Sequence, residues 1–365
     1  MTTKNKEEIT LKSIIATIGP SCNSNKKLLE LKKAGVDIFR VNMSHSSIED
    51  LSKYAKFGLE NDIKIGLDTE GAQIRTILKG KSSIILKKNN YIKIYKNIED
   101  SGINQGISFY PEESFNQIEE GCLIRLDFNG ACIQVEKKAN SFLECKCVSS
   151  GLVENNKGVD ILNKKLNLPD FTEKDLKSFE LLNLLKISEV FISFCKSSNA
   201  VYKLRSISDK IKVTSKIESK QSIHNLYEIC EASDAILIDR GDLTREINIM
   251  DIPFAQRGII KVANLLNKPC FVATNVFESL IKGNLPTRAE LNDVVGTLEM
   301  GAAGIVLAAE TAIGSKPLLS VEIVKELMHR YLLYQNNLLF ADVERNEITD
   351  FDMKLWLNRN DKKID

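Results

Sequence analysis

The feature that most constrains the fold of this chain is a set of short apolar segments, each of which ends in polar residues. Their apolar residues follow one another without polar alternation, which is typical of strands covered on both faces, as in the parallel sheets of α/β proteins. Eight such segments occur: SIIATIGPS, DIFRVNMSH, IKIGLDTEG, EVFISFCKS, KVTSKIES, DAILIDRGD, KPCFVATNV and AGIVLAAET. Amphipathic stretches of helical length, such as NKKLLELKKAG and FAQRGIIKVANLLN, separate most of them. Eight β-α units predict an α/β protein with a TIM (β/α)8 barrel.

The polar ends of these predicted strands are evenly spaced, with one exception. They lie at Thr17, Asn42, Asp68, Ser193, Lys216, Asp239, Thr274 and Ala308. Successive ends are 23 to 35 residues apart, except for the interval of 125 residues from Asp68 to Ser193. An insertion of about 90 residues therefore follows the third strand, at the end of the barrel where the active sites of such barrels lie.

The insertion has a different pattern from the rest of the chain. Short strand-like pieces such as NYIKIYK and FLECKCVS are separated by NN, NG and SG turns, without a convincing amphipathic helix. We expect a small all-β domain that acts as a lid and excludes water when substrate binds. The predicted boundaries are residues 1–72 and 166–333 for the barrel, 73–165 for the inserted β lid domain and 334–365 for a short polar C-terminal tail.

Composition narrows the class of function. The 50 basic and 49 acidic residues leave a net charge of +1, which gives no electrostatic reason to expect a nucleic acid or a membrane surface as a partner. Apolar stretches are far shorter than the roughly 20 residues that a bilayer requires, and the segment MTTKNKEEIT lacks the apolar core of a signal peptide. The sequence therefore predicts a cytoplasmic protein with small-molecule substrates. Its eight cysteines form no CxxC pair and are expected to be reduced thiols.

Charged and polar residues gather at the predicted strand ends. They are Arg40, Asn42, Ser44 and His45 after the second strand, Asp68 and Thr69 after the third, Lys216 and Glu218 after the fifth, Asp242 after the sixth and Thr274 after the seventh. Glu218 and Asp242 come from neighbouring strands, and two carboxylates with room for further oxygen ligands suit Mg²⁺. A lysine beside them and an arginine opposite favour an anionic substrate and a charge-rich transition state. Phosphoryl transfer or enolate chemistry fits best.

Each of these residues also has a simpler interpretation. A single Lys or Asp at a strand end is more often a solvated loop charge or a helix cap than a catalytic group. Convergence of these five strand ends favours a site over that interpretation.

Nine segments resemble, in the same order, segments of the pyruvate kinase family. They are ATIGPSC, FRVNMSH, LDTEGAQIRT, NKGVD, LPDFTEKD, SKIES, RGDL, VATNVFESLIKGNLPTRAE and AAETAIG. The resemblance covers residues 12 to about 330. It implies a barrel whose insertion after the third strand is a mobile lid, and a Mg²⁺-dependent transfer of phosphate from phosphoenolpyruvate to a nucleoside diphosphate, which gives pyruvate and a nucleoside triphosphate.

The resemblance also implies roles for individual residues. Glu218 and Asp242 match the ligands of the Mg²⁺ that holds phosphoenolpyruvate, and Lys216 matches the lysine that stabilises the transferring phosphoryl group. Thr274 matches the threonine beside the substrate's carboxylate and enol carbon. The backbone amides of Gly241 and Asp242 match the groups that bind that carboxylate.

Two further sets of residues match sites for ions and phosphates. The residues that match contacts to the phosphates of phosphoenolpyruvate or the nucleotide are Arg40, His45, Arg75 and Lys157. Those that match a monovalent-cation site, for K⁺, are Asn42, Ser44, Asp68 and Thr69. Lys216, Thr274 and Arg40 are the expected catalytic residues.

The chain departs from the family's pattern at several of these motifs. The family's DTKGPEIRT is DTEGAQIRT here, with Glu70, Ala72 and Gln73. The family's glutamate at the last of these positions accompanies K⁺ dependence, so neutral Gln73 leaves the need for K⁺ undecided. Other departures are Thr244, Asn275, Ala308, Ala309 and Ile313. Asp239 replaces a small residue, and its carboxylate would repel an anionic substrate unless it is paired or points away.

Two alternatives to a pyruvate kinase remain open on the sequence. One is a metal-dependent lyase or aldolase that acts on an enolate in the same kind of barrel; the residues that serve phosphates argue against it. The other is a diverged paralogue that uses another keto acid or binds a ligand without turnover, which the departures support. The family's C-terminal effector domain has no counterpart in this sequence, from which we expect a monomer or homodimer without sugar-phosphate activation.

Overall fold

The computed structural model describes residues 12–335, except residues 72, 100, 101, 103, 128, 129 and 165. Eight parallel strands form a closed barrel, which confirms the predicted fold class. They are β1 (Ser13–Thr17), β2 (Ile38–Asn42), β3 (Ile65–Asp68), β13 (Glu189–Ile192), β14 (Lys212–Ile217), β15 (Ala235–Asp239), β16 (Cys270–Ala273) and β17 (Gly304–Leu307). Every predicted strand end lies within one residue of an observed one. Of the predicted C-terminal tail, residues 336–365 lie outside the described residues, as does Ala72, whereas residues 334 and 335 belong to a helix.

Residues 38–273 form one compact unit, which contains six of the barrel strands. These strands pair in parallel in the order β2, β3, β13, β14, β15 and β16. Every residue of β3, β13, β15 and β16 is buried, as expected for strands without polar alternation. The helices of this unit outside the insertion are α2 (Ile48–Glu60), α4 (Glu173–Phe179), α5 (Ser198–Ile207), α6 (Lys220–His224), α7 (Leu226–Ala232), α8 (Arg240–Glu246), the short 3₁₀ helix η1 (Ile249–Asp251) and α9 (Ile252–Leu265).

Residues 12–37 and 274–335 belong to a second compact unit. Within it β1 pairs in parallel with β17. Its helices are α1 (Asn25–Ala34), α10 (Glu278–Ile281), α11 (Arg288–Glu299), α12 (Ala309–Ala312) and α13 (Pro317–Gln335). Gly35 ends α1 at a φ of 118°, a conformation that a residue with a Cβ rarely adopts. None of the helices in the described part of the chain is long and apolar enough to cross a membrane.

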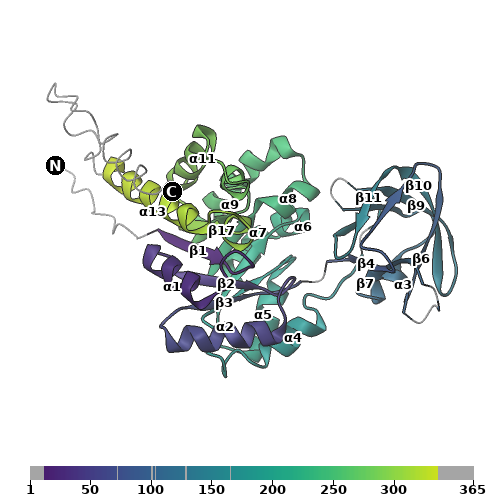
Figure 1. Ribbon diagram of the computed structural model, residues 1–365, viewed down its shortest axis with the longest axis horizontal. Coiled ribbons are helices and arrows are strands. Elements are labelled where there is room, and N and C mark those ends of the chain that lie inside the picture. The colour runs from purple at the N-terminus through teal and green to yellow at the C-terminus, as the bar shows by residue number, and fades with distance from the viewer. Residues whose placement is uncertain are drawn as a thin grey trace. The chain divides into compact units, whose positions relative to one another are not determined.

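A separate set of strands lies between β3 and β13 in the sequence (Figure 1). They are β4 (Arg75–Lys79), β5 (Ser83–Leu86), β6 (Tyr91–Tyr95), β7 (Gly106–Tyr110), β8 (Leu123–Leu126), β9 (Cys132–Lys138), β10 (Phe142–Ser149), β11 (Gly151–Glu154) and β12 (Val159–Ile161). Seven of them form one sheet in the order β12, β8, β9, β10, β6, β7 and β4, and β11 pairs with β5. The additional sheet was expected, whereas the five-residue helix α3 (Glu113–Gln117) in the same insertion was not.

The inserted sheet has a hydrophobic core of its own. Alternate residues of β10 are buried, among them Leu143 and Cys145, which pack with Ile94, Ile107 and Ile133. Burial raises the pKa of Cys145 to about 12, so this thiol acts as an apolar core group. All eight cysteines are free thiols.

Helix α4 fixes the loop that follows β3. Thr172 and Asp175 form a capping box at the start of α4. In this arrangement the side chain of each residue accepts a hydrogen bond from the backbone N–H of the other. The buried Asp175 also accepts the backbone N–H groups of Glu70 and Gly71, at 2.7 and 3.1 Å. The chain therefore leaves β3 in a defined direction, next to the residues that form the candidate site.

Candidate functional site

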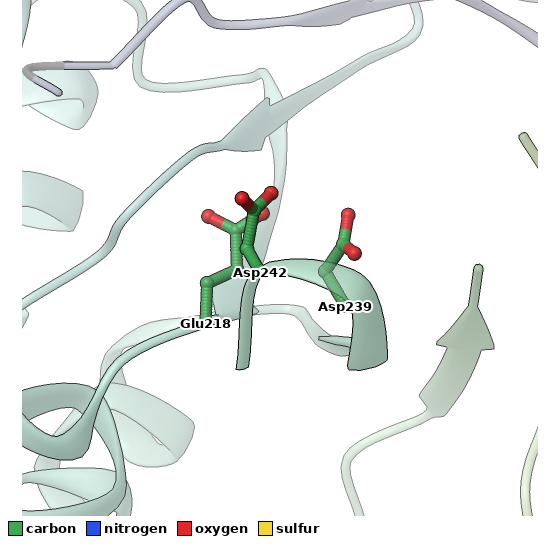
Figure 2. A group of neighbouring side chains, drawn as sticks. All are labelled: Glu218, Asp239 and Asp242. Carbon is green, nitrogen blue, oxygen red and sulfur yellow. The ribbon is translucent and has the colours of Figure 1, made fainter. Parts of the chain in front are cut away.

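Three carboxylates meet at the carboxyl ends of β14 and β15 (Figure 2). Glu218 directly follows β14, Asp239 is the last residue of β15, and Asp242 lies in the first turn of α8. Each offers one oxygen, and these oxygens lie within 4.8 Å of one another. Helix α8 begins directly after β15, so the RGD motif places Asp242 beside the strand end. The structure thus brings together the two residues expected to hold Mg²⁺, and adds Asp239 to them.

Lys216 is the cation shared by this group. Its Nζ lies 2.6 Å from Glu218 Oε1, 3.4 Å from Asp68 Oδ1 and 3.6 Å from Asp239 Oδ2. Nζ also donates to Ser193 Oγ at 3.2 Å. Burial lowers the pKa of Lys216, but the charges of Asp68, Glu218 and Asp239 outweigh it and hold the pKa above its usual value. Lys216 is therefore a fixed, buried positive charge.

The extra carboxylate of Asp239 is paired. Asp239 is buried and was expected to repel an anionic substrate unless it found a partner; Lys216 is that partner. The pairing divides the charge of one ammonium among three carboxylates.

Arg40 and Asp68 form a second buried ion pair at the ends of β2 and β3. Arg40 Nη1 lies 3.2 Å from Asp68 Oδ2, and Arg40 lies inside β2 rather than after it. Ser193 Oγ donates to Asp68 Oδ1 at 3.2 Å. The carboxylate of Asp68 is therefore placed between Arg40 and Lys216.

The four residues expected to form a K⁺ site lie at the same two strand ends. Asn42 and Asp68 are directly opposite each other in the β2–β3 register. Asn42 Oδ1 accepts the N–H of Ser44 at 2.9 Å, and Thr69 Oγ1 accepts the N–H of Ser193 at 2.8 Å. Oxygens of these residue types suit a hard cation.

The donor set of the carboxylate cluster fits a divalent cation. Burial raises the pKa of Glu218 to about 8, against the opposing effect of Lys216. Burial and the charge of Asp239 also raise the pKa of Asp242. Like-charged groups held together out of water are destabilised until a cation neutralises them. Oxygen ligands from Glu218 and Asp242 are the kind that Mg²⁺ binds.

A depression of about 620 Å³ lies beside the start of α2. Its lining residues are Ser44, His45, Ser46, Ser47, Ile48, Glu49, Asn156 and Lys174. Burial, and then the charges of Arg75 and Lys174, lower the pKa of His45. Arg75 donates to Ser44 Oγ at 3.4 Å and to the carbonyl of Asn156 at 3.2 Å. Arg75 and Lys174 thus form a cationic region that suits phosphate, with the imidazole of His45 beside them.

Lys174 was not predicted from the sequence, whereas Lys157 was. Lys174 lies in the first turn of α4 and lines the depression, and its Nζ donates to the carbonyl of Met43. Lys157 instead pairs with Glu154 at 3.3 Å on an exposed part of the insertion. The motif LPDFTEKD contained the signal for Lys174, because a lysine just after a helix cap projects from the helix start.

Gly241 lies at the start of α8, and Thr274 directly follows β16. Gly241 is the second residue of α8, and its carbonyl accepts the hydroxyl of Thr244 at 2.6 Å. That contact gives the departure at Thr244 a structural role. Thr274, in the other compact unit, has a φ of 65°. This conformation is strained for a β-branched residue, and such strain clusters at functional sites.

The loop after β16 is held from within its own unit. The buried carboxylate of Glu310 accepts the backbone N–H groups of Val276 and Phe277 through Oε1, and that of Ala308 through Oε2. Glu310 belongs to the AAETAIG motif. The motif therefore fixes the backbone that follows Thr274 and Asn275.

Comparisons with known proteins point to one family. A family model described as "Pyruvate kinase, barrel domain" matches residues 9–321. The chain is 31% identical over 328 residues to pyruvate kinase isozyme G, chloroplastic, of Nicotiana tabacum (85% of this chain, 57% of the relative). It is 31% identical over 324 residues to pyruvate kinase of Agrobacterium vitis (87% and 68%) and 32% identical over 327 residues to pyruvate kinase of Staphylococcus aureus strain USA300 (86% and 56%).

The chain spans little more than half the length of most of these relatives, 57% of the tobacco protein and 56% of the S. aureus protein. Its match to the family model nevertheless extends over most of its own length, from the first barrel strand to α13. This chain belongs to the pyruvate kinase family.

Proposed function

We propose that this chain is a Mg²⁺-dependent phosphotransferase of the pyruvate kinase type, which converts phosphoenolpyruvate and a nucleoside diphosphate into pyruvate and a nucleoside triphosphate. The observation that carries the proposal is the convergence of Glu218 and Asp242 beside the buried cation Lys216, in a member of this family. Carboxylates for a metal and a fixed ammonium are the groups that phosphoryl transfer requires.

Glu218 and Asp242 are the proposed ligands of Mg²⁺. A bound Mg²⁺ would coordinate oxygen atoms of the substrate and neutralise charge that develops during transfer. Glu218 is held for this purpose by the N–H of Phe194, which donates to Oε2 at 2.6 Å. The carboxylate therefore has one oxygen fixed by the backbone and the other next to Lys216.

Lys216 and Arg40 are the proposed stabilisers of the transferring phosphoryl group. Both are buried and both are held by Asp68. A cation whose position is fixed before substrate binds costs no reorganisation at the transition state. Thr274 and the backbone amides of Gly241 and Asp242 are proposed to hold the carboxylate of the three-carbon acid.

The depression beside α2 is the proposed place for the phosphates of the nucleotide. Lys174, which lines it, and Arg75, which donates to the lining residue Ser44, supply its positive charge. We add Lys174 to the residues inferred from the motifs. Lys157 remains a proposed phosphate contact that a movement of the insertion would bring in. Residues 73–165 are proposed to act as the lid.

Asn42, Ser44, Asp68 and Thr69 are the proposed K⁺ site. The register of β2 and β3 supports it, since it places Asn42 beside Asp68. Gln73 is uncharged, and the need for K⁺ is to be decided by assay.

A second candidate function is turnover of another keto acid or enolate, or ligand binding without turnover. Asp239 favours it, because this carboxylate is added to the group around Lys216 and reduces the positive charge available to a trianionic substrate. A metal-dependent lyase or aldolase would act without a nucleotide, so nucleotide dependence separates the reactions.

An assay of pyruvate formation tests the proposal. The purified protein is supplied with phosphoenolpyruvate, Mg²⁺ and each of several nucleoside diphosphates, with and without K⁺, and Lys216→Met serves as the inactive control. Pyruvate that appears only with both nucleotide and Mg²⁺ supports the proposal. Pyruvate formed without nucleotide would mean that water accepts the phosphoryl group, which contradicts the proposal. No pyruvate under any condition supports the lyase alternative or the diverged paralogue.

A further inference from the structure

A charged network joins the inserted sheet to the carboxylate cluster, and its central residue is Arg245. We propose that Arg245 is a positioning residue that links the segment around Asp160 to Asp242, so that divalent-cation binding and the docking of the insertion are coupled. The inference rests on the proposed function in one respect, because it takes Asp242 to be a metal ligand.

Arg245 uses two nitrogens for two different carboxylates. Nη1 lies 3.6 Å from Asp242 Oδ1, three residues earlier in α8. Nη2 lies 3.3 Å from Asp160 Oδ2 and 3.5 Å from Asp160 Oδ1, in the inserted sheet. The side chain of Arg245 is only 13% exposed, so water screens these interactions little. The guanidinium therefore connects a proposed metal ligand to a residue of β12.

Asp160 is itself fixed within the inserted sheet. Asp160 of β12 lies directly opposite Arg125 of β8 in the strand register. Arg125 donates to Asp160 Oδ2 through Nε at 3.2 Å and through Nη2 at 2.9 Å. Both bonds converge on the same carboxylate oxygen, and as charge-assisted bonds they hold that oxygen in place beside Arg125.

Arg125 also contacts the backbone of Arg245. Its Nη2 donates to the carbonyl of Arg245 at 2.9 Å. The carbonyl near the end of α8 and the guanidinium of the same residue are thus both held from the inserted sheet. A movement of that sheet away from α8 would break both contacts together.

Gly158 leaves the space that the guanidinium occupies. A Cβ at this position would lie 2.1 Å from Arg245 Nη2 and 2.4 Å from Nη1. The clash involves the far end of a flexible side chain, so Gly158→Ala would displace the guanidinium and leave the backbone pairing in place. The backbone hydrogen bonds of this segment would remain in Gly158→Ala, because they do not involve a side chain at position 158. One of them runs from the N–H of Asp127 to the carbonyl of Gly158.

These contacts have a consequence for metal binding. A group that orients a metal-ligating carboxylate commonly changes metal affinity by about 10- to 100-fold when it is removed. Because Arg245 is also bound to Asp160, the orientation of Asp242 depends on the position of the inserted sheet. Linkage is reciprocal, so a cation bound at Asp242 stabilises the docked position of the segment around Asp160.

Binding of Mn²⁺ to the full chain without substrate tests the link and requires no turnover. Free Mn²⁺ is measured by electron paramagnetic resonance during titration. Arg245→Met should weaken binding about 10-fold, and Arg245→Lys should weaken it less, since it keeps the charge. Asp160→Asn changes no proposed metal ligand, yet it should weaken binding at least about threefold. The double variant should bind Mn²⁺ as Arg245→Met does, since both changes break one connection.

Two further variants make the result specific. Gly158→Ala should reproduce the effect of Arg245→Met through displacement of the guanidinium. Arg205→Met is the matched control: Arg205 forms a comparable pair with Asp234 at 2.9 Å, away from the carboxylate cluster, and its loss should leave Mn²⁺ affinity unchanged. Amide hydrogen exchange of residues 157–161 should slow on addition of Mn²⁺ in the wild type and in Arg205→Met, but not in Arg245→Met.

Wild-type Mn²⁺ affinity in Arg245→Met would overturn the inference. Weakened binding in Arg245→Met with unchanged binding in both Asp160→Asn and Gly158→Ala would overturn the connection to the insertion. A wild-type protein that binds Mn²⁺ but does not turn over phosphoenolpyruvate contradicts the proposed function alone, and the same variants then still decide the link. A wild-type protein that binds no Mn²⁺ contradicts both.

Discussion

Lys216 Nζ lies 2.6 Å from Glu218 Oε1, and the two residues are separated by one position at the end of β14. Residues two apart on a strand point to the same side, so the motif SKIES places the proposed phosphoryl-stabilising cation and a proposed metal ligand next to each other. Each residue therefore sets the charge that the other experiences. Variants at the two positions should change different kinetic constants, and not merely the same constant to different extents.

Lys216→Met should lower kcat by about a hundredfold or more, with little change in the KM for phosphoenolpyruvate. The reason is that a buried, fixed ammonium stabilises charge that develops in the transition state more than it stabilises bound substrate. Steady-state kinetics at saturating nucleotide and Mg²⁺ measure both constants. A loss confined to KM would show that Lys216 holds the substrate in its ground state.

Asp242→Asn should leave the fold intact and weaken divalent-cation binding at least about tenfold, because one of two proposed carboxylate ligands is lost. Calorimetric titration with Mg²⁺ measures the affinity, and circular dichroism verifies the fold. The exposed Asp251 supplies a matched control, Asp251→Asn, which should bind Mg²⁺ like the wild type. Equal affinity in Asp242→Asn and the wild type would exclude Asp242 as a ligand.

Asp239→Ala should lower the KM for phosphoenolpyruvate by at least about threefold, because a carboxylate that competes for Lys216 is removed from the path of an anionic substrate. The comparison uses the wild type at the same free Mg²⁺. An unchanged or raised KM would mean that Asp239 assists the binding of substrate or metal. That result would favour a substrate with less negative charge than phosphoenolpyruvate.

Lys174→Ala should raise the KM for the nucleoside diphosphate about tenfold or more, since a charge-assisted contact to phosphate is lost, and should leave the KM for phosphoenolpyruvate nearly unchanged. Lys157→Ala should have a smaller effect, because Lys157 is engaged with Glu154. If Lys157→Ala raised the KM for the nucleoside diphosphate more than Lys174→Ala did, Lys157 and not Lys174 would be the main contact to the nucleotide.

Thiol titration tests the burial of the cysteines. Burial raises the pKa of Cys145 and of Cys195 to about 12, so both remain protonated and unreactive at pH 8, where thiolates react. The native protein should therefore expose fewer than eight reactive thiols to a disulfide reagent, and all eight after denaturation in guanidinium. Rapid reaction of all eight in the native state would contradict the packing of both cores.

The barrel could be predicted from the sequence because its signals are local. Apolar runs such as AILID mark strands directly, and each polar residue that follows them marks a strand end. The approach of Glu218 to Asp242 was also predictable, since adjacent parallel strands end at the same edge of a barrel. The structure adds the register of β2 and β3, which places Asn42 beside Asp68.

Other contacts could not be predicted because they depend on side-chain direction and on residues far apart in the chain. The pairing of Asp239 with Lys216 requires the distance between two strands, and the place of Lys174 requires the direction of α4. The network of Arg245, Asp160 and Arg125 joins positions up to 120 residues apart. Only the place of Lys174 has a signal in a recognised motif, LPDFTEKD, and none of the motifs contains both partners of the other contacts.

The proposed function requires that phosphate moves from phosphoenolpyruvate to a nucleoside diphosphate at this site. Phosphorus NMR of the purified protein with phosphoenolpyruvate, a nucleoside diphosphate and Mg²⁺ tests it most directly, because it follows the phosphoryl group itself. We predict that the phosphoenolpyruvate signal decays as the γ-phosphate signal of a nucleoside triphosphate grows. Both changes should be about a hundredfold slower or more with Lys216→Met, and neither should occur after chelation of Mg²⁺. Loss of the phosphoenolpyruvate signal with release of inorganic phosphate, or a spectrum that does not change, would contradict the claim.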